Sequence, residues 1–269
     1  MAKPIIALLT DFGTRDHYAG SLKGVVLTLC PDAVLVDISH DIPPHDILTG
    51  ALELAACYRF FPPGTIFLAV VDPGVGSGRL GLAAEAGDYR FVAPDNGVLT
   101  AVFAETPPKR VVSLTERRYA RPTISKTFEG RDRFAPAAAW LARGAEVKAL
   151  GSAVREFVRL AIPQPQQEGD RIAGAVLRVD RFGNLVTNIP RAMVERLAGR
   201  GPIRITAGAT SVDSLVETYA GVAAGAICAL FGSSDHLEIA ENGGHAATRL
   251  GLAAGAPVEV VRPSDAVLG

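Results

Sequence analysis

An uninterrupted apolar run that ends in an aspartate constrains the fold of this chain more than any other feature. Residues 65–71 carry no charge, and Asp72, Pro73 and three glycines at alternate positions follow them. A short run of this kind with a turn behind it is typical of a strand buried on both faces, as in a parallel sheet. Asp72 would then leave the sheet at the carboxyl end of that strand, where α/β folds bind their ligands.

The rest of the first half alternates apolar runs with segments of helical spacing, which predicts an α/β fold with a mostly parallel, Rossmann-like sheet flanked by helices. In chain order we expect a strand over 5–10, a helix over 18–29, a strand over 33–38, a helix over 46–60, the buried strand over 65–71, a hairpin over 80–94, a helix near 99–103 and a helix over 135–143.

The composition changes near residues 162–169, where prolines and glutamines replace the apolar patterns. Such a stretch buries little and cannot continue a helix, so we interpret it as an interdomain linker. Beyond it, short apolar runs are separated by Gly, Asn and Asp, which predicts a small all-β domain, a barrel. The expected division is an α/β N-terminal domain over 1–163, a linker over 164–171 and a β-barrel C-terminal domain over 172–269.

The composition excludes several classes of function. The 269 residues are 48% hydrophobic with a net charge of -1, so we expect no nucleic-acid partner and favour a small neutral or zwitterionic ligand. The three cysteines lie far apart and the histidines lack metal-ligand spacing, so we expect neither a metal nor a cofactor. No signal segment and no run of about 18 apolar residues is present, which favours the cytoplasm and no membrane partner.

Asp72 and Arg79 are the first candidates for chemistry. An ordinary turn with a surface ion pair explains their spacing as well. A phosphate-binding loop would need a helix directly after Gly74, Gly76 and Gly78, whereas the sequence predicts a hairpin there.

Other polar residues follow expected strand ends. Asp11 closes the first strand and could bind two ribose hydroxyls; its Asp-Phe-Gly setting lacks the companion motifs of a kinase. Asp16 and Tyr18 lie in the same loop and could reach a ligand, although Asp16 could equally cap the next helix. In the second domain Asn184 could address a purine edge and Phe182 could stack on it, but turn chemistry explains Asn184 equally well.

The segment 128–136 concentrates charges between apolar residues immediately before a helix. A solvated loop in which Asp132 caps the helix is the alternative to a functional role. Residues 232–236 and 241–244 flank a further strand and offer hydroxyls and backbone N–H groups.

Together and in this order, these motifs resemble the S-adenosyl-L-methionine hydroxide adenosyltransferase family, whose relatives include fluorinating and chlorinating enzymes. The resemblance covers essentially the whole chain. It rests on six segments: residues 9–13, 71–79, 93–97, 127–132, 180–184 and 237–240.

The resemblance implies a homotrimer with active sites between neighbouring subunits, and cleavage of the C5′–S bond of S-adenosylmethionine (SAM) by a water-derived nucleophile, giving adenosine and methionine. It implies Asp72, Arg79 and Glu129 as the catalytic set. The substrate-binding set that it implies is Asp11 for ribose; Asp16, Asp180 and Ser233 for the methionine part; Asn184 and the Gly243 backbone for adenine; and Tyr18, Phe128, Phe182 and Tyr219 as further contacts.

The reaction needs a base and a cation because water must be deprotonated as it attacks, while the sulfonium leaves as a neutral thioether. Asp72 and Arg79 are residues of these types, but Glu129 stands where hydrolytic members of the family carry a histidine. Glu129 could accept a proton, yet it could also pair with Arg79 and weaken that residue's effect on hydroxide. We expect a hydrolase with altered pH dependence or reduced rate.

Two alternatives remain open. One is a protein that binds SAM or a nucleoside with little turnover. The other is a halogenase, which we favour less because a buried carboxylate at position 72 repels halide.

Overall fold

In the computed structural model, which describes residues 3–199 and 201–263, the chain forms two units, Met1–Ile162 and Pro163–Gly269. Each unit has its own hydrophobic core. The first is an α/β unit and the second is built mainly from antiparallel strands.

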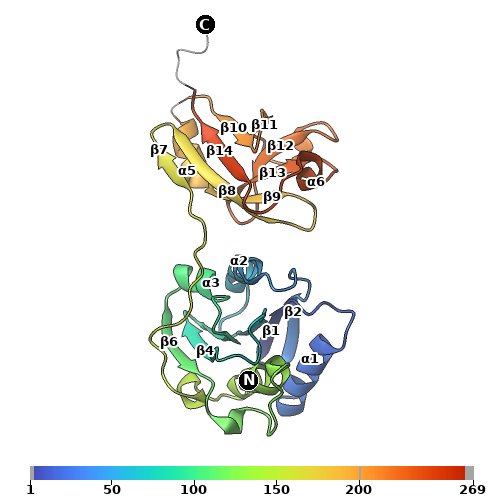
Figure 1. The fold of residues 1–269 in the computed structure, drawn as a ribbon, viewed down its shortest axis with the longest axis vertical. Helices are drawn as coiled ribbons and strands as arrows, with labels where there is room; N and C mark the ends of the chain where they lie inside the picture. The colour runs from blue at the N-terminus through green and yellow to red at the C-terminus, as the bar shows by residue number, and fades with distance from the viewer. Residues whose placement is uncertain (1–2, 200, 264–269) are drawn as a thin grey trace. The chain divides into compact units, whose positions relative to one another are not determined.

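A six-stranded sheet forms the middle of the first unit (Figure 1). Its strands, in spatial order, are β2 (Val34–Ser39), β1 (Ile5–Thr10), β3 (Ile66–Val70), β5 (Tyr89–Pro94), β4 (Gly81–Ala86) and β6 (Pro108–Ser113). The first four are parallel, and β4 runs antiparallel to both of its neighbours. The predicted hairpin is therefore present as β4 and β5, and no helix follows the glycine-rich turn.

Helices cover both faces of this sheet. They are α1 (Tyr18–Leu29) and α4 (Ala135–Ala142) on one face, and α2 (Ile47–Cys57) and α3 (Thr100–Glu105) on the other. Because side chains alternate along a strand, Leu8 packs into the core beneath α1 and α4 whereas Leu9 packs beneath α2 and α3. Both are fully buried, which explains why the central strands are apolar throughout.

The order of the strands creates a crevice at one point of the sheet edge. From β1 the chain continues to β2 on one side, and then crosses to β3 on the other side. Where connections diverge in this way, the carboxyl ends of the adjacent strands leave space for a ligand. Thr10 of β1 is in register with Val70 of β3, so Asp11 and Asp72 both emerge beside this space.

The second unit is an eight-stranded, nearly closed sheet. The strands are β7 (Gln166–Glu168), β8 (Arg171–Val179), β9 (Leu185–Pro190), β10 (Arg204–Ala207), β11 (Thr210–Val212), β12 (Ile227–Phe231), β13 (His236–Glu241) and β14 (Pro257–Val261). A bridge between Leu215 and Ala229 brings the two ends of the sheet together. The helices α5 (Arg191–Ala198) and α6 (Ala246–Leu250) complete the unit.

Short helical turns lie between these elements: η1 (Tyr58–Phe60), η2 (Arg117–Tyr119), η3 (Gly130–Phe134), η4 (Val147–Leu150) and η5 (Tyr219–Gly221). The predicted fold class, a helix-flanked, mostly parallel sheet plus a small barrel-like domain, is confirmed. Within the stretch interpreted as linker, β7 pairs with β8, because an antiparallel partner satisfies its backbone groups despite its polar sequence. Among the described residues no helix has the length and apolar character that crossing a membrane requires.

Candidate functional site

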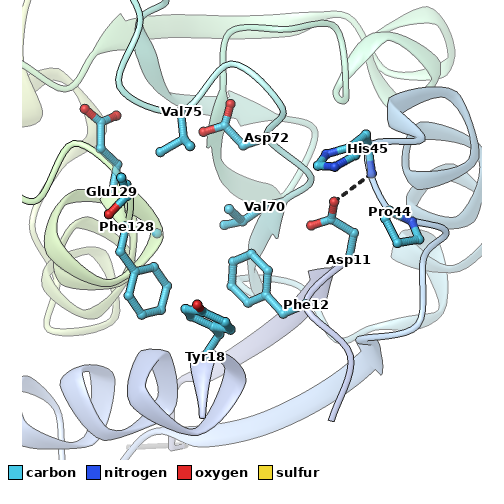
Figure 2. A pocket seen from close by; sticks show the side chains of 12 residues that line it. Asp11, Phe12, Tyr18, Pro44, His45, Val70, Asp72, Val75, Phe128 and Glu129 are labelled. Carbon is cyan, nitrogen blue, oxygen red and sulfur yellow. Dashed lines mark hydrogen bonds between the residues drawn. The ribbon is translucent and has the colours of Figure 1, made fainter. Parts of the chain in front are cut away.

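A cavity of about 290 Å³ opens at the crevice beside β1 and β3. Figure 2 shows Asp11 and His45 on one side of this cavity and Phe128 and Glu129 on the opposite side. Its lining residues are Asp11, Phe12, Tyr18, Pro44, His45, Val70, Asp72, Val75, Thr127, Phe128, Glu129 and Gly130. Five of the residues predicted from the sequence, Asp11, Tyr18, Asp72, Phe128 and Glu129, thus line one cavity in the first unit.

Asp11 is held by the backbone of the loop that precedes α2. The N–H of His45 donates to Asp11 Oδ2 at 2.9 Å, as drawn in Figure 2. His45 has a left-handed backbone (φ 69°), which is uncommon for a residue with a side chain and often marks a functional site. In the described part of the chain, Oδ1 of Asp11 accepts no hydrogen bond, so it is available for ligand hydroxyls.

Three aromatic rings form an apolar wall of the cavity. Tyr18 and Phe128 meet edge to face with ring centroids 5.1 Å apart, and Phe12 lies 5.9 Å from Phe128. Tyr18 is 42% exposed although it packs against these rings. A wall of this kind suits the flat or apolar part of a small ligand.

Asp72 and Arg79 form a two-point ion pair at the edge of the cavity. Arg79 Nε donates to Asp72 Oδ1 at 2.9 Å, and Arg79 Nη2 donates to Asp72 Oδ2. The side chains are only 5% and 9% exposed. Hence the pair is not the surface ion pair that their spacing alone allowed.

Glu129 joins the same cluster from the other side. Its Oε2 lies 2.8 Å from Arg79 Nη1, and its Oε1 lies 3.5 Å from Arg133 Nη2. Burial by itself lowers the pKa of Arg79, but the hydrogen bonds and charges of Asp72 and Glu129 more than offset this and raise it overall. Arg79 is therefore a fixed, permanently charged cation between two carboxylates.

Close backbone packing brings the two loops of this cluster together. A Cβ on Gly76 would lie 2.2 Å from the carbonyl oxygen of Lys126, and Gly76 also has a φ of +78°. Both conditions require glycine. Glu129 immediately precedes η3, a π-helical turn that continues into α4, and such turns are frequent at functional sites.

Asp132 anchors the loop that carries Glu129, and the alternative of a solvated loop with Asp132 as helix cap is wrong. Its side chain is 1% exposed and binds Arg131 at 2.7 Å and Arg121 at 3.1 Å, and it accepts the N–H of Ser125 at 2.9 Å. Burial raises the pKa of Asp132, but these partners outweigh it and the pKa is lowered overall. Asp132 does not cap a helix because it lies inside η3, and the N-cap residue of α4 is Phe134.

The second unit gathers another group of predicted residues. Asp180 Oδ1 accepts the N–H groups of Phe182 and Asn184 at 2.9 and 2.8 Å, and Asp180 Oδ2 accepts Asn184 Nδ2 at 2.9 Å. Asp180 and Asn184 thus stabilise a turn, as the alternative interpretation of Asn184 predicted. Phe182 is 75% exposed, which leaves its ring free to contact a ligand.

Glu238 is a neighbour of this group that sequence reasoning missed. Asn184 Nδ2 lies 3.4 Å from the hydroxyl of Tyr219, which donates to Glu238 Oε2 at 3.5 Å. Burial first, and the charge of Asp180 second, raise the pKa of Glu238. Glu238 lies on β13 between buried apolar residues, and its local sequence does not indicate that it contacts Tyr219.

The remaining predicted residues are exposed. Asp16, Ser233 and Gly243 lie in loops, and α1 begins after His17 without a side-chain capping hydrogen bond, so the capping role considered for Asp16 is wrong. Sequence reasoning also missed His45, whose proximity to Asp11 depends on the fold. The described residues contain no group of three or more His, Cys, Asp or Glu side chains that could hold a metal ion.

Two family models match the chain. The one described as the SAM hydroxide adenosyltransferase N-terminal domain matches residues 6–151, and the one for the C-terminal domain matches residues 174–259.

Individual proteins give the same picture. An (R)-S-adenosyl-L-methionine hydrolase of Thermus thermophilus is 37% identical over 264 residues, which cover 95% of this chain and 99% of the relative. A fluorinase of an Actinoplanes species is 31% identical over 292 residues, covering 96% of this chain and 98% of the fluorinase. A crystal structure of an uncharacterized conserved protein from Thermotoga maritima superposes with a TM-score of 0.90 at 34% identity, covering 96% of this chain and 100% of that one.

Proposed function

This chain belongs to the SAM hydroxide adenosyltransferase family, and from that premise we propose that it hydrolyses SAM to adenosine and L-methionine. The observation that carries the proposal is the buried cluster in which Asp72 clamps Arg79 beside the cavity. Relatives named (R)-S-adenosyl-L-methionine hydrolase support it over nearly the whole chain.

The chemistry requires an activated water in line with C5′. In the proposed step the water oxygen bonds to C5′, the C5′–S bond breaks, and its electron pair remains on sulfur, which leaves as the thioether of methionine. The water proton passes to Asp72. Arg79 stabilises the hydroxide character that develops on the oxygen, and its rigid position means that no reorganisation is needed when the charge appears.

Glu129 sets the limits of this mechanism. Its carboxylate contacts Nη1 of Arg79, the guanidinium nitrogen that does not bind Asp72, so part of the guanidinium charge is already neutralised before water binds. We therefore propose a hydrolase whose rate and pH dependence differ from those of members that carry histidine here.

Substrate binding divides between the units in this proposal. Asp11, whose Oδ1 accepts no hydrogen bond from any described residue, takes the ribose hydroxyls, and the aromatic wall of Tyr18 and Phe128 takes apolar parts of the substrate. Asp180 and Asn184 of the second unit, with the exposed rings of Phe182 and Tyr219, take the methionine and adenine ends. We propose that they do so in a neighbouring copy of a homotrimer, which light scattering of the purified protein tests.

The test of the function is hydrolysis in water enriched in ¹⁸O. The purified protein is incubated with SAM, and adenosine and methionine are quantified by chromatography with mass detection. We expect equal amounts of both products and one ¹⁸O atom at the 5′ oxygen of adenosine. The Asp72→Asn protein serves as control. Saturable SAM binding without product release would instead show a binding protein with little turnover.

Halide use is the second candidate, because a fluorinase is also a relative. Asp72 argues against it, since a halide would have to take the place of the attacking water beside a buried carboxylate, which repels an anion. Adding chloride or fluoride to the same assay should give no 5′-halogenated product. Separate incubations with the two sulfonium epimers of SAM test whether this chain shares the preference that the names of its hydrolase relatives express.

A further inference from the structure

Arg133 is a second cation beside the candidate active site, and neither the family resemblance nor the sequence motifs assigned it a role. Its Nη2 lies 3.5 Å from Glu129 Oε1, four residues earlier in the chain. We infer that Arg133 is a positioning residue for hydrolysis, which balances the charge of Glu129 so that Arg79 remains able to stabilise hydroxide. This inference rests on the proposed function.

The charges around Glu129 support this role. Arg79 faces Glu129 from the loop after β3, Arg133 faces it from η3, and Asp72 lies behind Arg79 at the end of β3. Asp11 and His45 line the opposite side of the cavity. Without Arg133, two buried carboxylates would share the single guanidinium of Arg79, which makes protonation of the cluster easier.

Arg133 is also built into the site. Its Nη1 donates to the carbonyl oxygen of Leu114 at 3.1 Å, which fixes the head group. A Cβ on Gly81 would lie 3.2 Å from Arg133 Cδ and 2.5 Å from Phe134 Cε1, so glycine leaves room for both side chains. The ring of Phe134 in turn lies 5.2 Å from the Arg79 guanidinium carbon.

Among the described residues, Arg133 forms one ion pair, with Glu129. Within residues 3–199 and 201–263, its buried Nε has no hydrogen-bond partner. The side chain is 29% exposed, compared with 11% for Glu129. An interaction of this kind, partly shielded from water, is stronger than an ordinary surface pair.

The experiment compares pH–rate profiles of Arg133→Met, Arg133→Lys and the wild type. Methionine keeps the apolar stem but removes the charge. We expect the acid limb of the kcat profile of Arg133→Met to move to higher pH by about one unit, with about tenfold lower kcat on that limb. KM should stay within about twofold, because Arg133 does not line the cavity. Arg133→Lys should restore most of the profile.

A second pair of variants separates this role from a structural one. In a Glu129→Gln background, Arg133→Met should no longer move the acid limb, because the charge that Arg133 balances is gone. The matched control is Arg110→Met, since Arg110 lies 3.6 Å from Glu85 away from the cavity; its profile should match that of the wild type. The inference would be overturned if the acid limb of Arg133→Met coincided with that of the wild type. It would also be overturned if Arg133→Met shifted the limb by the same amount in the Glu129→Gln background.

A measurement that does not depend on turnover distinguishes failure of the proposed function from failure of the inference about Arg133. If the wild-type protein releases no adenosine, the proposed function fails. Whether Arg133 balances the charge of Glu129 is then tested separately, by thermal unfolding of the single variants Glu129→Gln and Arg133→Met and of the double variant. A loss of Tm in the double variant that is smaller than the sum of the single losses supports the pairing, and additive losses overturn it.

Discussion

Arg79 Nη1 lies 2.8 Å from Glu129 Oε2, so the guanidinium that would stabilise hydroxide is already in contact with a carboxylate. The other two nitrogens of Arg79 bind Asp72. This contact connects the glycine-rich turn after β3 to the segment before α4. It determines what the site can do, because a cation that is partly neutralised stabilises a new negative charge less.

Replacing Glu129 with His should preserve or raise turnover near neutral pH. A neutral imidazole would still accept a proton but would not neutralise Arg79. The measurement is kcat for adenosine release between pH 5 and pH 9. A large fall in turnover would show that Glu129 has a role of its own that histidine cannot take over.

Asp72→Asn should lower kcat by about 10²- to 10⁴-fold, the usual contribution of a general base. The amide keeps the size of the side chain but cannot accept the water proton. Affinity for SAM, measured by calorimetry, should change far less than kcat, because the chemical step depends on the base more than binding does. Equal losses in both would instead assign Asp72 to substrate binding.

Gly76→Ala should destabilise the protein by about 1–3 kcal/mol and reduce turnover. The new Cβ would collide with the Lys126 carbonyl and separate the two loops that carry Asp72 and Glu129. Gly78→Ala is the matched control, because a Cβ on Gly78 meets nothing within 4 Å. Denaturant unfolding and kcat should show a clear loss for Gly76→Ala and little change for Gly78→Ala. Equal losses in the two variants would contradict the conclusion that the close approach to Lys126 requires glycine at position 76.

Asp132→Asn should cost about 2 kcal/mol at neutral pH, because it removes the buried charge that its arginine partners bind. The lowered pKa of Asp132 means that its charge stabilises the fold fully above its ordinary value near 3.8. This contribution is lost as pH falls below that value and through the lowered one. Unfolding free energies of variant and wild type should therefore converge in acid, and a constant difference down to pH 2 would contradict the assignment.

Glu238→Gln should stabilise the second unit at neutral pH. Burial and Asp180 raise the pKa of Glu238, so the folded state holds its proton more tightly than the unfolded chain does. The stability of the wild type should consequently fall as pH rises above the ordinary value near 4.5, and the variant should lose this dependence. Thermal unfolding between pH 4 and pH 8 measures both; an unchanged pH dependence in the variant would exclude Glu238 as its source.

The local pattern of the sequence was sufficient for the central strands and their helices. The expected strand over 5–10 is β1 and the expected helix over 18–29 is α1, because a buried strand or an amphipathic helix repeats its own periodicity. Strands β6, β7, β9 and β11 and helices α5 and α6 were not predicted. Strand β6 begins with Pro108, Lys109 and Arg110, so its local sequence reads as a loop, and its pairing with β4 makes it a strand.

The sequence by itself determined that a carboxylate would follow each of two buried strands, and that Asp72 and Arg79 were the first candidates for catalytic residues. Only the tertiary structure decided that β1 and β3 are neighbours and that the N–H of His45 binds Asp11. It also decided that Arg79 lies between Asp72 and Glu129, and that Arg133 contacts Glu129. The physical reason is one of range. Backbone periodicity acts over a few residues, whereas charge and hydrogen bonding depend on which distant loops the packed core brings together.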